Sequence, residues 1–131
     1  MKRIEEIDYI IGDLVKNDNA IVRIVKCSLY DPNPYVAAPD KNKDIGYWQA
    51  NRKNIKPIPL TPAILEKNGW KKPEGFKSYW LGKIGLLYGD DGKWRVAMGN
   101  TALAIRHGVI QYVHQLQHLL FGLGLNSEMK I

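Results

Sequence analysis

Two histidines four residues apart, His114 and His118, form the pattern in this chain most typical of a metal site. Residues at this spacing share one face of a helix, so both imidazoles could bind one zinc ion or another transition metal. A zinc site needs three or four protein ligands, and the sequence has no HExxH glutamate and a single cysteine, Cys27. His107 would join the pair only if the helix began before Gly108. We therefore expect no metal and no other cofactor, and two histidines that pack or form hydrogen bonds at a helix edge.

Adjacent carboxylates at Asp90 and Asp91 could serve acid–base or metal chemistry. They lie within Gly89–Gly92, however, a stretch of residues that tolerate positive φ and therefore favour a tight turn. Cys27 lies within a segment of strand character, residues 20–30, which favours a small strand residue over a nucleophile. The sequence has no nucleophile elbow, phosphate-binding glycine loop or dinucleotide fingerprint. We expect no enzymatic activity and name no catalytic residue, although the members of a catalytic triad need not be neighbours in sequence.

Positive charge is concentrated in the middle of the chain. The 131 residues carry 19 Lys and Arg against 13 Asp and Glu, a net charge of +6. Residues 41–83 hold ten of these basic residues, three of the acidic ones and six aromatic residues. Because cations can contact phosphates and aromatic rings can stack on bases, this pattern favours a polyanion such as nucleic acid. The alternative is a solvated lysine-rich face with the aromatic rings in the core.

The predicted binding surface combines basic and indole side chains of this segment. We expect them to form one basic face, with one of the two tryptophans exposed at its edge. The predicted residues are Trp48, Arg52, Lys53, Lys71, Lys72, Lys77 and Trp80.

The first 56 residues have the pattern of a small β lobe. Hydrophobic alternation and β-branched residues over 20–30, after the polar turn 16–19, favour a β-hairpin with residues 8–15. Further strands are expected at 35–38 and 45–55. Several short strands joined by tight turns are typical of an SH3-like barrel, which we predict for residues 1–56.

Residues 57–131 have the pattern of an α+β lobe. Thr61 as N-cap, Pro62 at the first helical position and Gly69 as C-terminal cap predict a short helix over 62–68. Strand-type segments at 78–88, 93–98 and 101–107, separated by turns, predict an antiparallel meander over 78–107.

The clearest helical pattern follows the meander. Apolar residues recur every three to four positions from Val109, which predicts a helix over 109–123 that covers the meander. The whole chain is therefore expected to be α+β, with an N-terminal barrel, a short linking helix and a C-terminal meander covered by one helix.

Composition limits the location of the protein. Hydrophobic residues make up 45% and charged residues 24%, values of an ordinary globular protein. No segment approaches the roughly 20 apolar residues that cross a bilayer, and Glu5, Glu6 and Asp8 lie where a signal peptide needs apolar residues. The single cysteine is typical of a reducing compartment. We expect a cytoplasmic protein without a membrane partner.

Two segments resemble a known group of proteins. Residues 55–62, IKPIPLTP, run into residues 64–70, ILEKNGW, and residues 111–119 read QYVHQLQHL. Both segments resemble small proteins of Bacteroidetes genomes and of their prophages and phages, as does IGDLV at residues 11–15. Trp70 departs from the phenylalanine that is usual there. The resemblance implies a bacterial or phage setting inside the cell, and it transfers no activity and no site residue.

The pattern as a whole favours a binding protein associated with a phage or mobile element, with nucleic acid as its partner. Two other classes stay open. An accessory protein could bind a host protein, or hold a nucleotide-like small molecule in a basic pocket beside Trp48 and Trp80. A structural protomer could use the apolar segment 119–125 to form a homo-oligomer.

Overall fold

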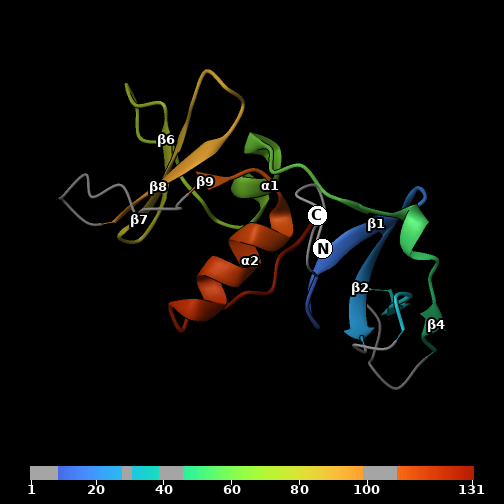
Figure 1. The fold of residues 1–131 in the computed structure, drawn as a ribbon. Coiled ribbons are helices and arrows are strands. Elements are labelled where there is room, and N and C mark those ends of the chain that lie inside the picture. Colours follow the sequence, from blue (N-terminus) through green and yellow to red (C-terminus); the bar gives the residue numbers. More distant parts are fainter. Residues whose placement is uncertain (1–8, 28–30, 39–45, 99–108) are drawn as a thin grey trace, which may run out of the picture. The chain divides into compact units, whose positions relative to one another are not determined.

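The computed structural model describes residues 9–27, 31–38, 46–98 and 109–131. The chain divides into two compact units, Met1–Ile58 and Pro59–Ile131. Each unit is built on one antiparallel sheet, and the second also holds the two α-helices of the described residues (Figure 1). The predicted α+β class is therefore confirmed. Within the described residues, no helix is both long and apolar enough to span a membrane.

The sheet of the first unit has the strand order β4-β3-β2-β1-β5. Its strands are β1 (Leu14–Asn17), β2 (Ala20–Lys26), β3 (Tyr35–Ala37), β4 (Trp48–Gln49) and β5 (Ile55–Pro57). The hairpin of β1 and β2 is as predicted, although its turn is only Asp18-Asn19. Asp18 has a φ of 54°, a conformation that a short polar side chain tolerates.

One face of this sheet holds the core of the first unit. Val22 and Ile24 alternate with less buried residues along β2, and they join Val15, Val36, Ala50 and Ile55 in one apolar cluster. Pairing among the described residues ends at β4 and β5 and does not join these two strands. The SH3-like barrel therefore stays a prediction.

The single strand predicted over 45–55 is wrong in its second half. After β4 the chain makes a short 3₁₀ turn, η1 (Arg52–Asn54), before β5 begins. The Asn51 side chain accepts a hydrogen bond from the backbone N–H of Lys53, and the Asn33 side chain accepts one from Arg52. Such local bonds from asparagine compete with the strand ladder, which explains the interruption.

The sheet of the second unit has the order β6-β7-β8-β9. Its strands are β6 (Ser78–Leu81), β7 (Ile84–Tyr88), β8 (Trp94–Met98) and β9 (Val109–Ile110). The segment 78–88 was predicted as one strand, but it folds back at Gly82, whose φ of 61° suits a tight turn. The turn predicted over 89–92 connects β7 and β8. The strand expected at 101–107 lies outside the described residues.

Helix α1 (Pro62–Lys67) begins as its sequence predicts. The Thr61 hydroxyl accepts a hydrogen bond from the backbone N–H of Ile64 at 3.3 Å, and Pro62 occupies the first helical position. Gly69, with a φ of 86°, follows the helix and lets the chain turn away.

Helix α2 (Val113–Gly122) begins later than predicted. Val109 and Ile110 form β9 and pair with Arg95 and Trp94, so the helix predicted from residue 109 is wrong at its start. The cause is Gln115, whose side-chain carbonyl accepts hydrogen bonds from the backbone N–H groups of Gln111 and Tyr112. This capping interaction fixes the first turn of the helix after Tyr112.

Candidate functional site

The residues predicted to form one basic face divide between the two units. The first unit holds Trp48, Arg52 and Lys53, and the second holds Lys71, Lys72, Lys77 and Trp80. In the first unit, Trp48 lies on β4 with 45% of its surface exposed, while Arg52 and Lys53 form the exposed turn η1. That the seven residues share one face stays a prediction.

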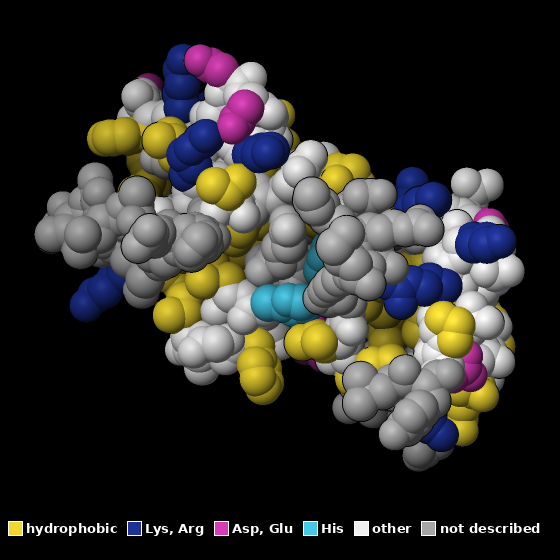
Figure 2. Space-filling model, in the orientation of Figure 1, with side chains coloured by type: hydrophobic (Ala, Val, Ile, Leu, Met, Phe, Trp, Pro, Cys, Tyr) yellow, Lys and Arg dark blue, Asp and Glu magenta, His cyan; other side chains and the backbone are white. Residues whose placement is uncertain are grey.

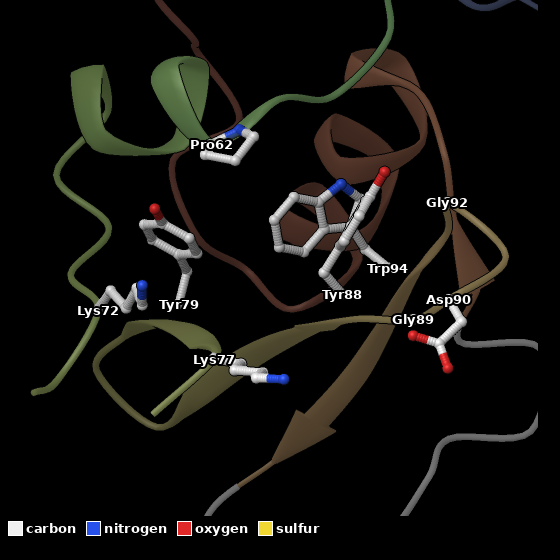
Figure 3. A pocket seen from close by; sticks show the side chains of 9 residues that line it. All are labelled: Pro62, Lys72, Lys77, Tyr79, Tyr88, Gly89, Asp90, Gly92 and Trp94. Atoms are coloured by element: carbon white, nitrogen blue, oxygen red, sulfur yellow. The ribbon is translucent and has the colours of Figure 1, made fainter. Parts of the chain in front are cut away.

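Two of the predicted lysines line a pocket in the second unit (Figure 3). The pocket has a volume of about 510 Å³, a size typical of sites for small ligands. Its walls come from the start of α1, the segment before β6, and the strands β6, β7 and β8 with the β7–β8 turn. The lining residues are Pro62, Lys72, Lys77, Tyr79, Tyr88, Gly89, Asp90, Gly92 and Trp94.

Trp94 gives the pocket a fixed aromatic wall. Its indole is 1% exposed and donates a hydrogen bond of 2.9 Å to the backbone carbonyl of Leu60. The ring of Tyr88 lies against it, with centroids 4.7 Å apart and planes inclined by 56°. Tyr88 nevertheless keeps 52% of its surface exposed. A buried ring thus supports a second ring that a ligand can reach.

Tyr79 forms another wall and ties the sheet to α1. Its ring meets Trp94 edge-on at 5.9 Å, and its hydroxyl donates a hydrogen bond of 2.7 Å to the carboxylate of Glu66. This hydrogen bond raises the pKa of Tyr79, with smaller contributions from burial and from the charge of Glu66. The phenol therefore stays protonated and keeps its donor directed at the helix.

The β7–β8 turn is held by an ion pair between Asp91 and Arg95. The guanidinium donates two hydrogen bonds to the carboxylate, at 2.9 and 3.2 Å, and the backbone N–H of Lys93 donates a third. The Arg95 bonds, followed by the Lys93 bond, lower the pKa of Asp91 to about 2. The two side chains of this ion pair lie next to Gly89. A Cβ added to Gly89 would lie 2.8 Å from the Asp91 carboxylate and would overlap the Arg95 guanidinium. Turn chemistry thus accounts for Asp91, as predicted.

The Asp90 side chain, unlike that of Asp91, does not hold the turn together. It is exposed and lines the pocket, and no described residue forms a hydrogen bond or ion pair with its carboxylate. Lys72 and Lys77 are exposed as well, and neither ammonium pairs with a carboxylate in the described ranges. The lining therefore carries two positive charges and one negative charge. Figure 2 shows positive and negative side chains side by side over the β7–β8 end of this unit.

Trp80 and Lys71 are not part of the pocket lining. Their backbones exchange two hydrogen bonds, at 2.7 and 2.9 Å, which continue the sheet beyond β6. Successive strand residues point to opposite faces, so Trp80 lies on the face opposite Tyr79. Its indole covers Gly85, where an added Cβ would come within 2.7 Å of the ring. Trp80 is consequently half-buried, and one side of its ring is covered by β7.

The two histidines of α2 are placed differently from each other. His114 is 2% exposed, whereas His118 is partly exposed, and their rings meet edge-on at 5.5 Å. His114 also lies parallel to Tyr112, 5.9 Å away. Burial, assisted by the nearby His118, lowers the pKa of His114 to about 4. His114 is therefore neutral at neutral pH and lies deeper than the predicted helix edge. The described residues contain no group of three His, Cys, Asp or Glu that could hold a metal ion.

The sequence interpretation missed Tyr88. Its alternation with Leu86 along β7 is typical of a core residue, but in the structure Leu86 is buried and Tyr88, which pairs with Trp94, is exposed. An aromatic residue directly before the Gly89–Gly92 turn was the available signal.

Comparisons of the chain with models of protein families, with curated proteins and with solved structures gave no match.

Proposed function

We propose that this protein binds single-stranded nucleic acid through the pocket of its second unit. The observation that carries the proposal is the exposed ring of Tyr88, supported by buried Trp94, in the same pocket as two ammonium groups without partners among the described residues. A base can stack on the phenol while Lys72 and Lys77 contact the phosphates. Stacking on one aromatic ring contributes about 1–3 kcal/mol per base and tolerates any sequence.

The pocket favours single strands over duplexes. In a duplex both faces of each base are covered by its neighbours, so a ring such as Tyr88 has nothing to stack on. A volume of about 510 Å³ fits one nucleotide of a strand and not the width of a helix. The protein would thus act by holding exposed bases, without cleaving or modifying them.

The setting of this activity is part of the proposal. The resemblance of residues 55–70 and 111–119 to small phage and prophage proteins favours a place inside a bacterial cell, where single strands arise during replication and recombination. An SH3-like barrel in the first unit would suit a binding protein, and it stays a prediction. Trp48, exposed on β4, offers a further ring for stacking.

Fluorescence anisotropy of a labelled 20-nucleotide strand tests the proposal. We expect binding at 50 mM salt that weakens strongly at 200 mM, because each phosphate contact adds about 0.7 to the salt slope for single strands. A duplex of the same length should bind more weakly. The variant K72Q/K77Q should lose about 1.4 from the slope, whereas K83Q/K130Q, with the same charge change outside the pocket lining, should keep it. Absence of binding at 50 mM salt would remove nucleic acid as the partner.

A nucleotide-like small molecule is the second candidate, and the size of the pocket, about 510 Å³, favours it. A mononucleotide has one phosphate and one base, which suffices for Tyr88 and the two lysines. Competition distinguishes the two: a free mononucleotide that displaces the strand at equal concentration indicates a small-molecule site. A strand that binds far more tightly than its mononucleotides indicates a polymer site.

A further inference from the structure

One charged group in the pocket opposes the binding of any anion. Asp90 lines the same pocket as Lys72 and Lys77, and Figure 3 shows it on the turn that follows Tyr88. Its neighbour Asp91 is engaged by Arg95 and by the backbone of Lys93, whereas the Asp90 carboxylate has no partner among the described residues. The turn therefore does not require the Asp90 side chain. A pocket whose only role was to bind phosphates would bind them more tightly without this negative charge.

The backbone on both sides of Asp90 is fixed. The Gly89 N–H donates to the Lys93 carbonyl at 2.9 Å, and the Gly92 N–H donates to the Gly89 carbonyl at 3.1 Å. The hydroxyl of Tyr88 lies over Gly92, 3.6 Å from the position of an added Cβ. The phenol ring thus extends along the turn that carries Asp90. A base stacked on this ring would present its edge to the turn.

Carboxylates accept hydrogen bonds and donate none, so the edge of the base that meets Asp90 must offer N–H groups. Guanine offers two neighbouring donors, N1–H and the N2 amino group, which match the two oxygens of one carboxylate. Adenine and cytosine each offer one amino group. Thymine and uracil flank their single N–H with two carbonyl oxygens, which a carboxylate repels.

We propose that Asp90 makes this pocket selective for guanine among the bases of a single strand. The selectivity rests on the proposed function, because Asp90 can read a base only if the base stacks on Tyr88. A bidentate contact of this kind discriminates against a wrong base by about 1–3 kcal/mol, or roughly 5- to 150-fold in affinity. Lys72 and Lys77 hold the phosphates of every strand alike, so they set affinity and Asp90 sets preference.

The experiment uses the full chain and labelled ten-nucleotide strands of thymine that carry one central guanine, adenine, cytosine or inosine. We expect the guanine strand to bind at least fivefold more tightly than the thymine strand. Inosine lacks the N2 amino group, so its strand should fall to the level of adenine and cytosine. In Asp90→Asn the guanine preference should fall below twofold, while the affinity for the thymine strand should not decrease. Glu74→Gln removes an exposed carboxylate outside the lining and should keep the preference.

Three results would overturn the proposal. Equal binding of guanine and thymine strands by the wild type removes the selectivity and leaves the proposed function intact. A guanine preference that survives in Asp90→Asn assigns the selectivity to other residues. Failure of every strand to bind at low salt removes both the selectivity and the proposed function. The thermal midpoint of Asp90→Asn should match that of the wild type, because the carboxylate forms no hydrogen bond or ion pair with the described residues.

Discussion

The phenol ring of Tyr88 lies 4.7 Å from the buried indole of Trp94, and the two residues face each other across the β7–β8 ladder. Trp94 is anchored from behind by the hydrogen bond to the Leu60 carbonyl. Tyr88 is held against this support yet stays half exposed. Its ring is therefore ordered before any ligand arrives, which lowers the entropy cost of stacking.

Replacement of Tyr88 by alanine should weaken the binding of single strands by about 1–3 kcal/mol, the contribution of one stacked base. Phe121→Ala is the matched control, because Phe121 is an aromatic residue of α2 that is 73% exposed and outside the pocket lining. Anisotropy titrations of both variants at one salt concentration measure the difference. Equal affinities of the two variants would show that Tyr88 does not stack on a base.

Replacement of Gly89 by alanine should separate Arg95 from Asp91, because the added methyl group occupies the space of the guanidinium. The turn would then lose its ion pair, and the pKa of Asp91 should rise from about 2 toward 3.8, the ordinary value of an aspartate. A carbon-detected NMR titration of the Asp91 carboxyl reports this change. Gly122→Ala, at the exposed last residue of α2, where φ is not positive and an added Cβ has open space, is the control and should leave Asp91 unchanged.

Trp94→Phe should destabilise the second unit by about 1–3 kcal/mol, because the buried carbonyl of Leu60 loses the indole N–H that donates to it. Trp80→Phe should cost less, since the Trp80 N–H bonds to a serine hydroxyl on a half-buried face that water reaches. Urea denaturation followed by circular dichroism gives both values. The assignment of Trp94 as the support of the pocket would be wrong if Trp80→Phe were the more destabilised variant.

Stability should decrease in mild acid because of His114. The unfolded chain takes up a proton near pH 6.5, whereas the folded protein takes it up only near pH 4. Above about pH 6.5 His114 is neutral in both states and does not lower the free energy of unfolding. Between pH 6.5 and pH 4 that free energy falls by on the order of 3 kcal/mol. Urea midpoints at pH 7 and pH 5 measure the fall, which should be smaller in His114→Gln. An NMR titration of the wild-type imidazole with a pKa near 6.5 would contradict this account.

Local patterns predicted those elements of the fold whose signals lie within a few residues. Thr61, Pro62 and Gly69 mark the ends of α1, and Asp18 marks the β1–β2 turn, because capping and turn geometry depend on neighbouring side chains. The start of α2 was misplaced because apolar periodicity continues unbroken from Val109 through β9. Gln115 decides the boundary there by a bond to backbone N–H groups, which periodicity does not reveal.

The candidate site was predictable only in part. Lys72 and Lys77 stood out by charge, and the structure places both in one pocket. Tyr88 ends a strand and Asp90 lies in a turn. An aromatic residue is common in a strand and an aspartate is common in a turn, so neither residue type indicated a binding site. Tyr88 and Asp90 line the same pocket because of the β7–β8 pairing, in which Trp94 lies opposite Tyr88. The ion pair of the turn uses Asp91 and leaves Asp90 in the lining.

The central claim is that the pocket of the second unit contacts single-stranded nucleic acid, and NMR mapping tests it most directly. A ten-nucleotide strand is titrated into the full ¹⁵N-labelled chain at 50 mM salt, and the backbone amide shifts are followed. The account predicts that the largest changes fall on Lys72, Lys77 and residues 88–92, and that they are lost in K72Q/K77Q. Changes confined to α2 and residues 123–131, or no change at all, would contradict it.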